Sequence, residues 1–225
     1  MVGGSSAIGA AIATELAGLG REVVLWGRDR DRLETAATTV EAAGARARVA
    51  VVDVRQRDKL DSAAEAVRDG LDVVVWAAGV FDWADGDVAE PAALEELFDV
   101  NLVAAARLSR LLLPTLIRNA PGALVFVGSG AARQAYPHNA AYVASKHGLR
   151  GLAEALWLDV RDRGVKVSTV SPGLVAAGAG LASPEAARRP DLLLQPADVA
   201  AAVRFVCTFP ERACPTEIRL ESHRA

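Results

Sequence analysis

Val2-Gly3-Gly4-Ser5-Ser6-Ala7-Ile8-Gly9 is the stretch of this 225-residue chain that decides the fold. Its glycines let the backbone turn tightly, and the helical pattern that follows would aim free N–H groups at the turn. In a doubly wound parallel sheet, such a turn follows the central strand and holds the pyrophosphate of a dinucleotide. Ser5 and Ser6 can add hydroxyl donors. The alternative is a flexible, poorly ordered N-terminus, because a lone glycine motif is weak evidence.

Downstream of this turn, short apolar runs rich in Val, Leu and Ile alternate with longer helical patterns. This alternation predicts one α/β domain over residues 1–225, with a parallel sheet covered on both faces. The predicted strands are 22–26, 48–52, 72–77, 123–127, 165–170 and 217–220, and the predicted helices are 8–19, 29–43, 57–68, 92–118, 140–163 and 196–208. Residues 176–195 are rich in Ala, Gly and Pro, and we predict a mobile flap over a site there.

The central strand of this sheet is predicted to be truncated. Only Met1 and Val2 precede the glycine turn, whereas a strand normally has ~5 residues. We expect the true start of the coding sequence to lie upstream. The alternatives are that the chain is a fragment, or that the fold tolerates a stub.

Composition excludes several classes of protein. Hydrophobic residues make up 52% of the chain, which indicates a globular domain, and the formal net charge of −3 gives no reason to expect nucleic acid. No apolar run reaches the ~18–20 residues of a membrane helix, and no signal peptide is evident, so we expect a cytoplasmic protein without a membrane partner. Cys207 and Cys214 are expected to be free thiols, and no Cys/His cluster has metal-ligand spacing.

Tyr142 and Lys146 form a Tyr-x-x-x-Lys pair, although the chain has only two tyrosines and three lysines. Residues four apart lie on one face of a helix, and a cation beside a phenol lowers the pKa of that phenol. The pair therefore indicates an acid–base unit. The alternative is an exposed aromatic ring next to a solvated lysine.

The end of the second predicted strand reads Trp26-Gly27-Arg28. An acidic residue at this place would bind the ribose 2′-OH of NAD, whereas an arginine suits the 2′-phosphate of NADP. Arg28 therefore favours NADP over NAD. The alternative is that Arg28 is one more surface arginine.

Over nearly its whole length the chain resembles the short-chain dehydrogenase/reductase superfamily. The family's opening glycine motif is matched by Val2 to Gly9, and its aspartate after the third strand by Asp53, which Val54 follows. The Asn-Asn-Ala-Gly motif falls on Trp76-Ala77-Ala78-Gly79, without either asparagine, and a threonine of the family is replaced by Ala177. Other matches are Asn101, Ser129, which lies 13 residues before Tyr142, and the turn Pro172-Gly173.

The resemblance implies a Rossmann-like fold and hydride transfer between a nicotinamide cofactor, here NADP, and a carbonyl or alcohol carbon. It implies that Tyr142 acts as general acid, that Lys146 lowers the pKa of Tyr142 and holds the nicotinamide ribose, that Ser129 binds the substrate oxygen, and that Asn101 anchors a water. The implied cofactor-binding residues are Gly3, Ser5, Ser6, Ile8, Gly9, Arg28, Asp53, Val54, Ala78, Gly79, Tyr142, Lys146, Pro172, Gly173 and Val175.

Two further expectations concern substrate and assembly. A mostly apolar pocket, hence an apolar ketone or aldehyde, is expected from Phe81, Trp83, Ala131, Arg133, Tyr136, Leu174 and Leu181. Family members commonly form homodimers or homotetramers through the two long helices, predicted here at 92–118 and 140–163. The competing hypothesis is a non-catalytic dinucleotide-binding protein that senses redox state or acts as a scaffold.

Overall fold

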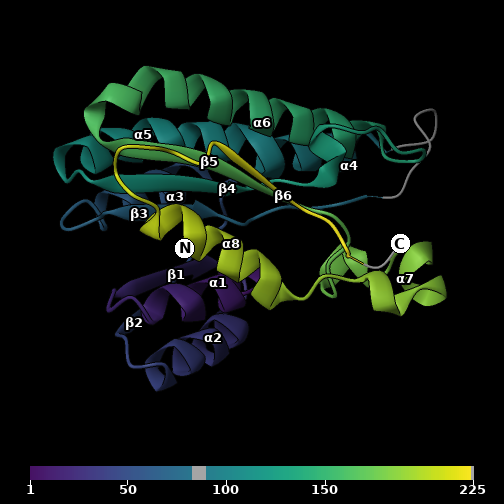
Figure 1. The fold of residues 1–225 in the computed structure, drawn as a ribbon, viewed down its shortest axis with the longest axis horizontal. Coiled ribbons are helices and arrows are strands. Elements are labelled where there is room, and N and C mark those ends of the chain that lie inside the picture. Colours follow the sequence, from purple (N-terminus) through teal and green to yellow (C-terminus); the bar gives the residue numbers. More distant parts are fainter. Residues whose placement is uncertain (83–89, 224–225) are drawn as a thin grey trace.

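A parallel β-sheet runs through the computed structural model, which describes residues 1–82 and 90–223 (Figure 1). The edge strand β2 (Ala47–Val51) pairs with β1 (Val23–Gly27). On the other side of Val2 lie, in order, β3 (Val73–Trp76), β4 (Gly122–Val127), β5 (Val165–Pro172) and β6 (Glu217–Leu220). The pairings are parallel, so the predicted doubly wound α/β sheet is confirmed.

The two parts of the sheet are joined by a central strand of only two residues. Val2 bridges Trp26 of β1 on one side and Trp76 of β3 on the other. Its N–H donates to the Val75 carbonyl and its carbonyl accepts from the Ala77 N–H, both at 2.9 Å. The Trp26 N–H donates to the Met1 carbonyl at 2.8 Å. The predicted short central strand is thus present, and it is enough to set the register of its neighbours.

Helices cover both faces of the sheet (Figure 1). One face carries α1 (Ala7–Ala17), α2 (Arg30–Ala42) and α8 (Pro196–Thr208), and the other carries α3 (Arg57–Glu65), α5 (Ala104–Arg118) and α6 (Ala140–Val160). Strand side chains alternate between these faces, as the period of two requires. In β3, Val74 and Trp76 pack under α5, while Val75 packs under α1 and α8.

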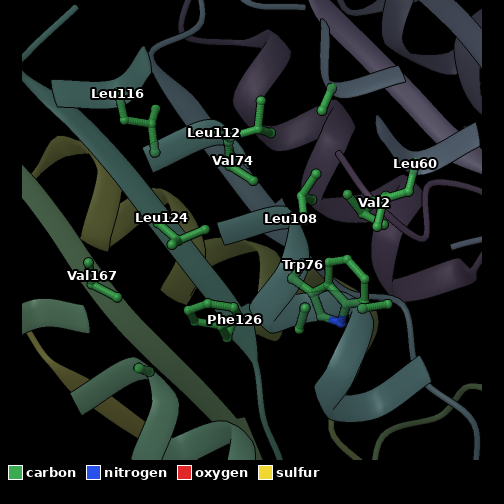
Figure 2. Close-up of a cluster of buried hydrophobic side chains, with 14 of the residues drawn as sticks. Val2, Leu60, Val74, Trp76, Leu108, Leu112, Leu116, Leu124, Phe126 and Val167 are labelled. Carbon is green, nitrogen blue, oxygen red and sulfur yellow. The ribbon is translucent and has the colours of Figure 1, made fainter. Parts of the chain in front are cut away.

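The larger core cluster is centred on Trp76 and Phe126, and Figure 2 shows both rings among aliphatic side chains from several elements. Leu108 and Leu112 of α5 enter from above the sheet, and Val2 contributes from the central strand. Trp76 is 1% exposed, which agrees with the expectation that it packs rather than binds ligand. A large apolar ring therefore stands where the family motif has an asparagine.

The helix predicted at 92–118 is interrupted by a π-helix. α4 (Pro91–Phe98) runs into η1 (Asp99–Val103), which runs into α5. The Ala104 N–H donates to the carbonyl of Asp99, five residues back instead of four. A π-helix holds one residue more than an α-helix would, and such turns are frequent at functional sites. Asn101, a predicted site residue, lies in this turn and is fully buried.

Pro91–Arg118 as a whole is the one helical stretch among the described residues that is long and apolar enough to cross a membrane. More than half of its most apolar window, 56%, is buried inside the domain. Its apolar residues include Leu97, Leu108 and Leu116, which are at most 2% exposed. The hydrophobicity of this stretch is thus accounted for by packing on the sheet.

The predicted flap, residues 176–195, contains three short helical turns. These are η4 (Gly178–Gly180), α7 (Pro184–Arg188) and η5 (Pro190–Leu192). A parallel bridge between Val175 and Leu194 ties the two ends of the segment together. Closed at its base in this way, the segment forms a separate lobe beside the sheet (Figure 1). Its mobility stays a prediction.

The position of Val2 gives a first test. Val2→Ala should lower the free energy of unfolding by about 2 kcal/mol, because it deletes two buried methyl groups at the joint of the sheet. The matched control is Val51→Ala in β2, where the side chain is 41% exposed and the loss should be well under half as large. Urea denaturation measures both. Equal losses in the two variants would show that the Val2 side chain contributes no more to stability than an exposed valine at the sheet edge.

Candidate active site

The glycine turn has no room for side chains at two positions. A Cβ on Gly3, whose φ is +84°, would lie 2.6 Å from the Ala78 nitrogen, and a Cβ on Gly9 would lie 2.1 Å from the Gly3 carbonyl oxygen. Such contacts are far shorter than real Cβ contacts. The turn thus brings its bare backbone against the loop after β3. Next to it lies the start of α1, whose first-turn N–H groups lack intrahelical partners. This is the arrangement that fits a pyrophosphate.

The two serines of the turn have different tasks. Ser6 is the N-cap of α1: its Oγ accepts from the Gly9 N–H at 3.0 Å and donates to the Gly3 carbonyl at 2.8 Å. Its hydroxyl proton is therefore engaged inside the turn in this structure, and the role of Ser6 as a hydroxyl donor to a cofactor stays a prediction. Ser5 lies against Gly27 at the end of β1, where a Cβ on that glycine would be 2.5 Å from the Ser5 Oγ.

A charged cluster lies at the ends of β1 and β2, where the adenosine half of a dinucleotide would be expected. Arg55 donates to both carboxylate oxygens of Asp53, with its Nη2 2.7 Å from Oδ2, and these bonds lower the pKa of Asp53. Arg28 and Arg55 both contact Glu96 of α4. Sequence reasoning identified Asp53 and Arg28 but missed Arg55 and Glu96. Arg55 could have been suspected from its spacing two residues after Asp53.

Asn101 joins three parts of the site. Its Nδ2 donates to the Val80 carbonyl at 2.9 Å and to the Ser145 Oγ at 3.1 Å, and its Oδ1 accepts from the Val80 N–H at 2.9 Å. The loop after β3 is thereby fixed against α6. Gly79 lies in that loop, and a Cβ there would be 3.3 Å from the Asn101 Oδ1 and 3.6 Å from the Lys146 Nζ. The side chain of Asn101 is a structural tie, and the water that it was expected to anchor stays a prediction.

Ser129, Tyr142 and Lys146 come together at the end of β4. Ser129 caps a short 3-10 turn, η2 (Gly130–Ala132), where its Oγ accepts from the Ala131 N–H at 3.1 Å. Tyr142 lies in the first turn of α6, close enough to Ser129 for that side chain to act on the pKa of Tyr142. Lys146 follows one turn later with its Nζ 5.6 Å from the centre of the Tyr142 ring, and it donates to the Val127 carbonyl at 3.3 Å. The alternative of a solvated pair fails, because Lys146 is only 5% exposed.

The ionisation of this pair is governed by burial. Burial raises the pKa of Tyr142, while Ser129 acts in the opposite direction. Burial also lowers the pKa of Lys146, to about 8. The net direction for the pKa of Tyr142 is thus upward, opposite to the lowering expected from the sequence. The physical reason is that desolvation of the phenolate outweighs the opposing effect of Ser129 on the pKa of Tyr142.

The remaining candidates are placed around these groups. Pro172 ends β5, and the Gly173 N–H donates to the Leu220 carbonyl at 2.8 Å. Val175 is 5% exposed at the base of the predicted flap. Ile8 and Val54 are partly buried and pack against the core clusters, and Ala78 does the same beside Gly79. All of these follow the carboxyl ends of strands or the glycine turn, so they share one edge of the sheet.

Of the predicted pocket residues, Phe81 packs edge-on against the Tyr142 ring, with centroids 4.7 Å apart. Arg133 instead forms an ion pair with Glu217 of β6. Ala131 is buried, whereas Tyr136, Leu174 and Leu181 are exposed. Trp83 lies outside the described residues.

Three features lie at one edge of a parallel sheet: a glycine turn of the dinucleotide type, a charged cluster at the ends of β1 and β2, and a Ser129–Tyr142–Lys146 group whose lysine is buried. Together they define the class of NAD(P)-dependent oxidoreductases. The family model described as short chain dehydrogenase matches residues 1–186. The chain belongs to the short-chain dehydrogenase/reductase family, and it is an NAD(P)-dependent dehydrogenase/reductase.

Known proteins similar to this chain span its whole length. An uncharacterised oxidoreductase of Staphylococcus aureus is 28% identical over 97% of this chain and 94% of its own. The alcohol dehydrogenase of the archaeon Thermococcus sibiricus, solved in complex with 5-hydroxy-NADP, superposes with a TM-score of 0.90 at 26% identity, covering 100% of this chain and 96% of that one. A metagenomic short-chain oxidoreductase in complex with NADP has a TM-score of 0.87 at 31% identity, with the same coverages.

The lowered pKa of Lys146 predicts how stability depends on pH. The folded state loses this proton near pH 8, whereas an unfolded lysine keeps it to about 10.5. From pH 8 to about pH 9.5 the unfolded chain therefore binds more protons, and the free energy of unfolding should rise by about 2 kcal/mol. The raised pKa of Tyr142 lies above this range.

Urea denaturation from pH 7 to about pH 9.5 measures this rise. Lys146→Met should show a rise smaller by about 2 kcal/mol, because the variant has no ammonium to bury. The contributions of the Met1 ammonium, whose pKa is lowered, and of the Cys207 thiol, whose pKa is raised, remain in both proteins. Lys59→Met, at an exposed position of α3, is the matched control and should keep the wild-type rise. An equal rise in the wild type and in Lys146→Met would contradict the lowered pKa of Lys146.

Proposed function

We propose that this protein is an NADP-dependent oxidoreductase that interconverts a carbonyl and an alcohol, with Tyr142 as the general acid–base. The observation that carries the proposal is the buried Lys146, whose Nζ lies 5.6 Å from the centre of the Tyr142 ring, with Ser129 close enough to influence the pKa of Tyr142. A pure binding protein has no need of a hydroxyl pair and an amine at that place. This favours catalysis over the alternative of a redox sensor or scaffold.

When bound, the nicotinamide cofactor supplies or accepts the hydride. In the reducing direction, the Tyr142 hydroxyl gives its proton to the substrate oxygen. A raised pKa suits that direction, because the phenol stays protonated until the oxygen gains charge. The Ser129 hydroxyl, next to Tyr142, donates a hydrogen bond to the same oxygen and stabilises its growing charge. Lys146, one turn further along α6, stabilises the phenolate that remains.

NADP is favoured over NAD by the position of Arg28. Its side chain is 57% exposed at the end of β1, where a 2′-phosphate would meet it. The two solved structures described above, which carry NADP or 5-hydroxy-NADP, support the same choice. An apolar ketone or aldehyde is supported by Phe81, whose ring adjoins Tyr142. The cytoplasmic location expected from the sequence stays a prediction.

The protein is proposed to act as a homodimer or homotetramer. Most apolar residues of α5 and α6 face the core, but Val103, which ends η1 just before α5, is 49% exposed, and Leu158 of α6 is 56% exposed. Light scattering should give two or four times the chain mass of 23.5 kDa. Val103→Glu together with Leu158→Glu should lower the mass toward that of one chain. A wild type that is monomeric at micromolar concentration would contradict this assembly.

Tyr142→Phe tests the chemistry directly. It should lower the turnover of NADPH with a responsive ketone, quinone or aldehyde by about 10²–10⁴-fold or more, because it removes the transferred proton. NADPH binding, followed by fluorescence, should change little. The chain offers a matched control in its other tyrosine: Tyr136 is 47% exposed, and Tyr136→Phe should stay within a few-fold of wild type.

Two outcomes would count against this function. A Tyr142→Phe variant with wild-type turnover would exclude Tyr142 as the acid. Tight NADPH binding without turnover on any member of a broad carbonyl panel would favour the redox sensor.

A further inference from the structure

Three charged side chains from three separate elements meet at the adenosine end of the site. Arg28 follows β1, Arg55 follows β2, and Glu96 lies on α4. The Oε1 atom of Glu96 is 2.8 Å from the Arg55 Nη1 and 3.4 Å from the Arg28 Nη1. Two guanidinium groups thus converge on a single carboxylate oxygen.

The rest of the cluster fixes the direction of Arg55. Its Nε and Nη2 are bonded to the carboxylate of Asp53, which leaves Nη1 as the nitrogen that faces Glu96. Asp53 is well covered, with its side chain 16% exposed, so this pairing anchors the arginine. The point between Arg28 and Arg55 is therefore a place where an anionic oxygen is in reach of two cationic donors. Phosphate oxygens are bound by arginines in the same way.

Glu96 holds this place only weakly. Its side chain is 38% exposed, and those of Arg28 and Arg55 are 57% and 36% exposed. Ion pairs with this degree of solvent contact contribute little, and salt screens them. The carboxylate can therefore swing away when a stronger anion arrives, but its charge remains close by and opposes that anion.

We propose that Glu96 is a specificity-determining residue: its carboxylate occupies the position between Arg28 and Arg55 that the 2′-phosphate of NADP takes, and it competes with that phosphate. The inference rests on the proposed use of NADP. It adds that Glu96 makes the preference for NADP over NAD smaller than the preference that Arg28 and Arg55 alone would give. An NAD-type adenosine, which has a hydroxyl in place of the phosphate, does not compete with Glu96.

The test uses equilibrium binding and needs no turnover. Calorimetry with 2′,5′-ADP, which carries the 2′-phosphate, and with 5′-ADP, which lacks it, reports on this position alone. Glu96→Gln keeps the size and removes the charge. It should tighten 2′,5′-ADP by about threefold to tenfold at low salt and leave 5′-ADP within about twofold. The gain should shrink at high salt.

The neighbouring Glu95 provides the matched control. It lies on the same helix and is exposed, and Glu95→Gln removes the same charge as Glu96→Gln. That variant should bind both probes within about twofold of wild type. Melting curves followed by circular dichroism check that both variants fold. Equal gains in the two variants would overturn the proposal, because the effect would then be one of net charge.

The remaining outcomes separate this inference from the function on which it rests. Arg28→Gln should weaken 2′,5′-ADP and not 5′-ADP; if it weakens neither, the NADP assignment fails and the role of Glu96 fails with it. If Arg28→Gln behaves as expected but Glu96→Gln weakens 2′,5′-ADP or leaves it unchanged, only the role of Glu96 is overturned. In that case the carboxylate would be holding the arginines in place for the phosphate.

Discussion

The backbone hydrogen bonds of the two-residue central strand are the constraint on which the other elements depend. Val2 and Met1 connect β1 to β3, and without these bonds the sheet would be two separate pieces. The N–H groups of Gly3 and Gly4 both donate to the Trp26 carbonyl at 2.9 Å, so the glycine turn is bonded to the same strand, β1, that Val2 joins to β3. The position of the cofactor turn and the integrity of the sheet are therefore set by one short run of backbone.

The Ser129, Tyr142 and Lys146 group lies at the same edge of the sheet, beside the loops that leave β3 and β4. Asn101 ties the loop after β3 to Ser145, and Ser145 lies beside Lys146 in α6. Through this tie, the strand that pairs with Val2 also positions the helix that carries Tyr142. Burial then shapes the ionisation of the pair: it raises the pKa of the phenol and lowers that of the amine. Burial thus favours the neutral form of both the Tyr142 phenol and the Lys146 amine, compared with the same groups in water.

The sequence predicted the strands, because short runs of apolar residues pack most readily as buried strands of a sheet. The spacing of Tyr142 and Lys146 placed both on one helix, as the structure has them, whereas Ser129 came from the family resemblance; the catalytic roles of the three stay predictions. Other features depend on tertiary contacts. The π-helix at Asp99–Val103 has no signature in the residue order. Glu96 reaches Arg28 only through the packing of α4, 68 residues away in the chain. The direction of the Tyr142 pKa shift depends on desolvation, which spacing alone does not reveal.

The π-helix has one more consequence. Because η1 absorbs its extra residue locally, α4 before it and α5 after it keep the phase of an ordinary helix, and Leu108, Leu112 and Leu116 still recur at intervals of four on the core face. Asn101 therefore projects from a turn that is separate from the regular helix whose leucines pack on the sheet. It is presented to Val80 and Ser145 by the π-turn itself, while those leucines come from the regular helix after it.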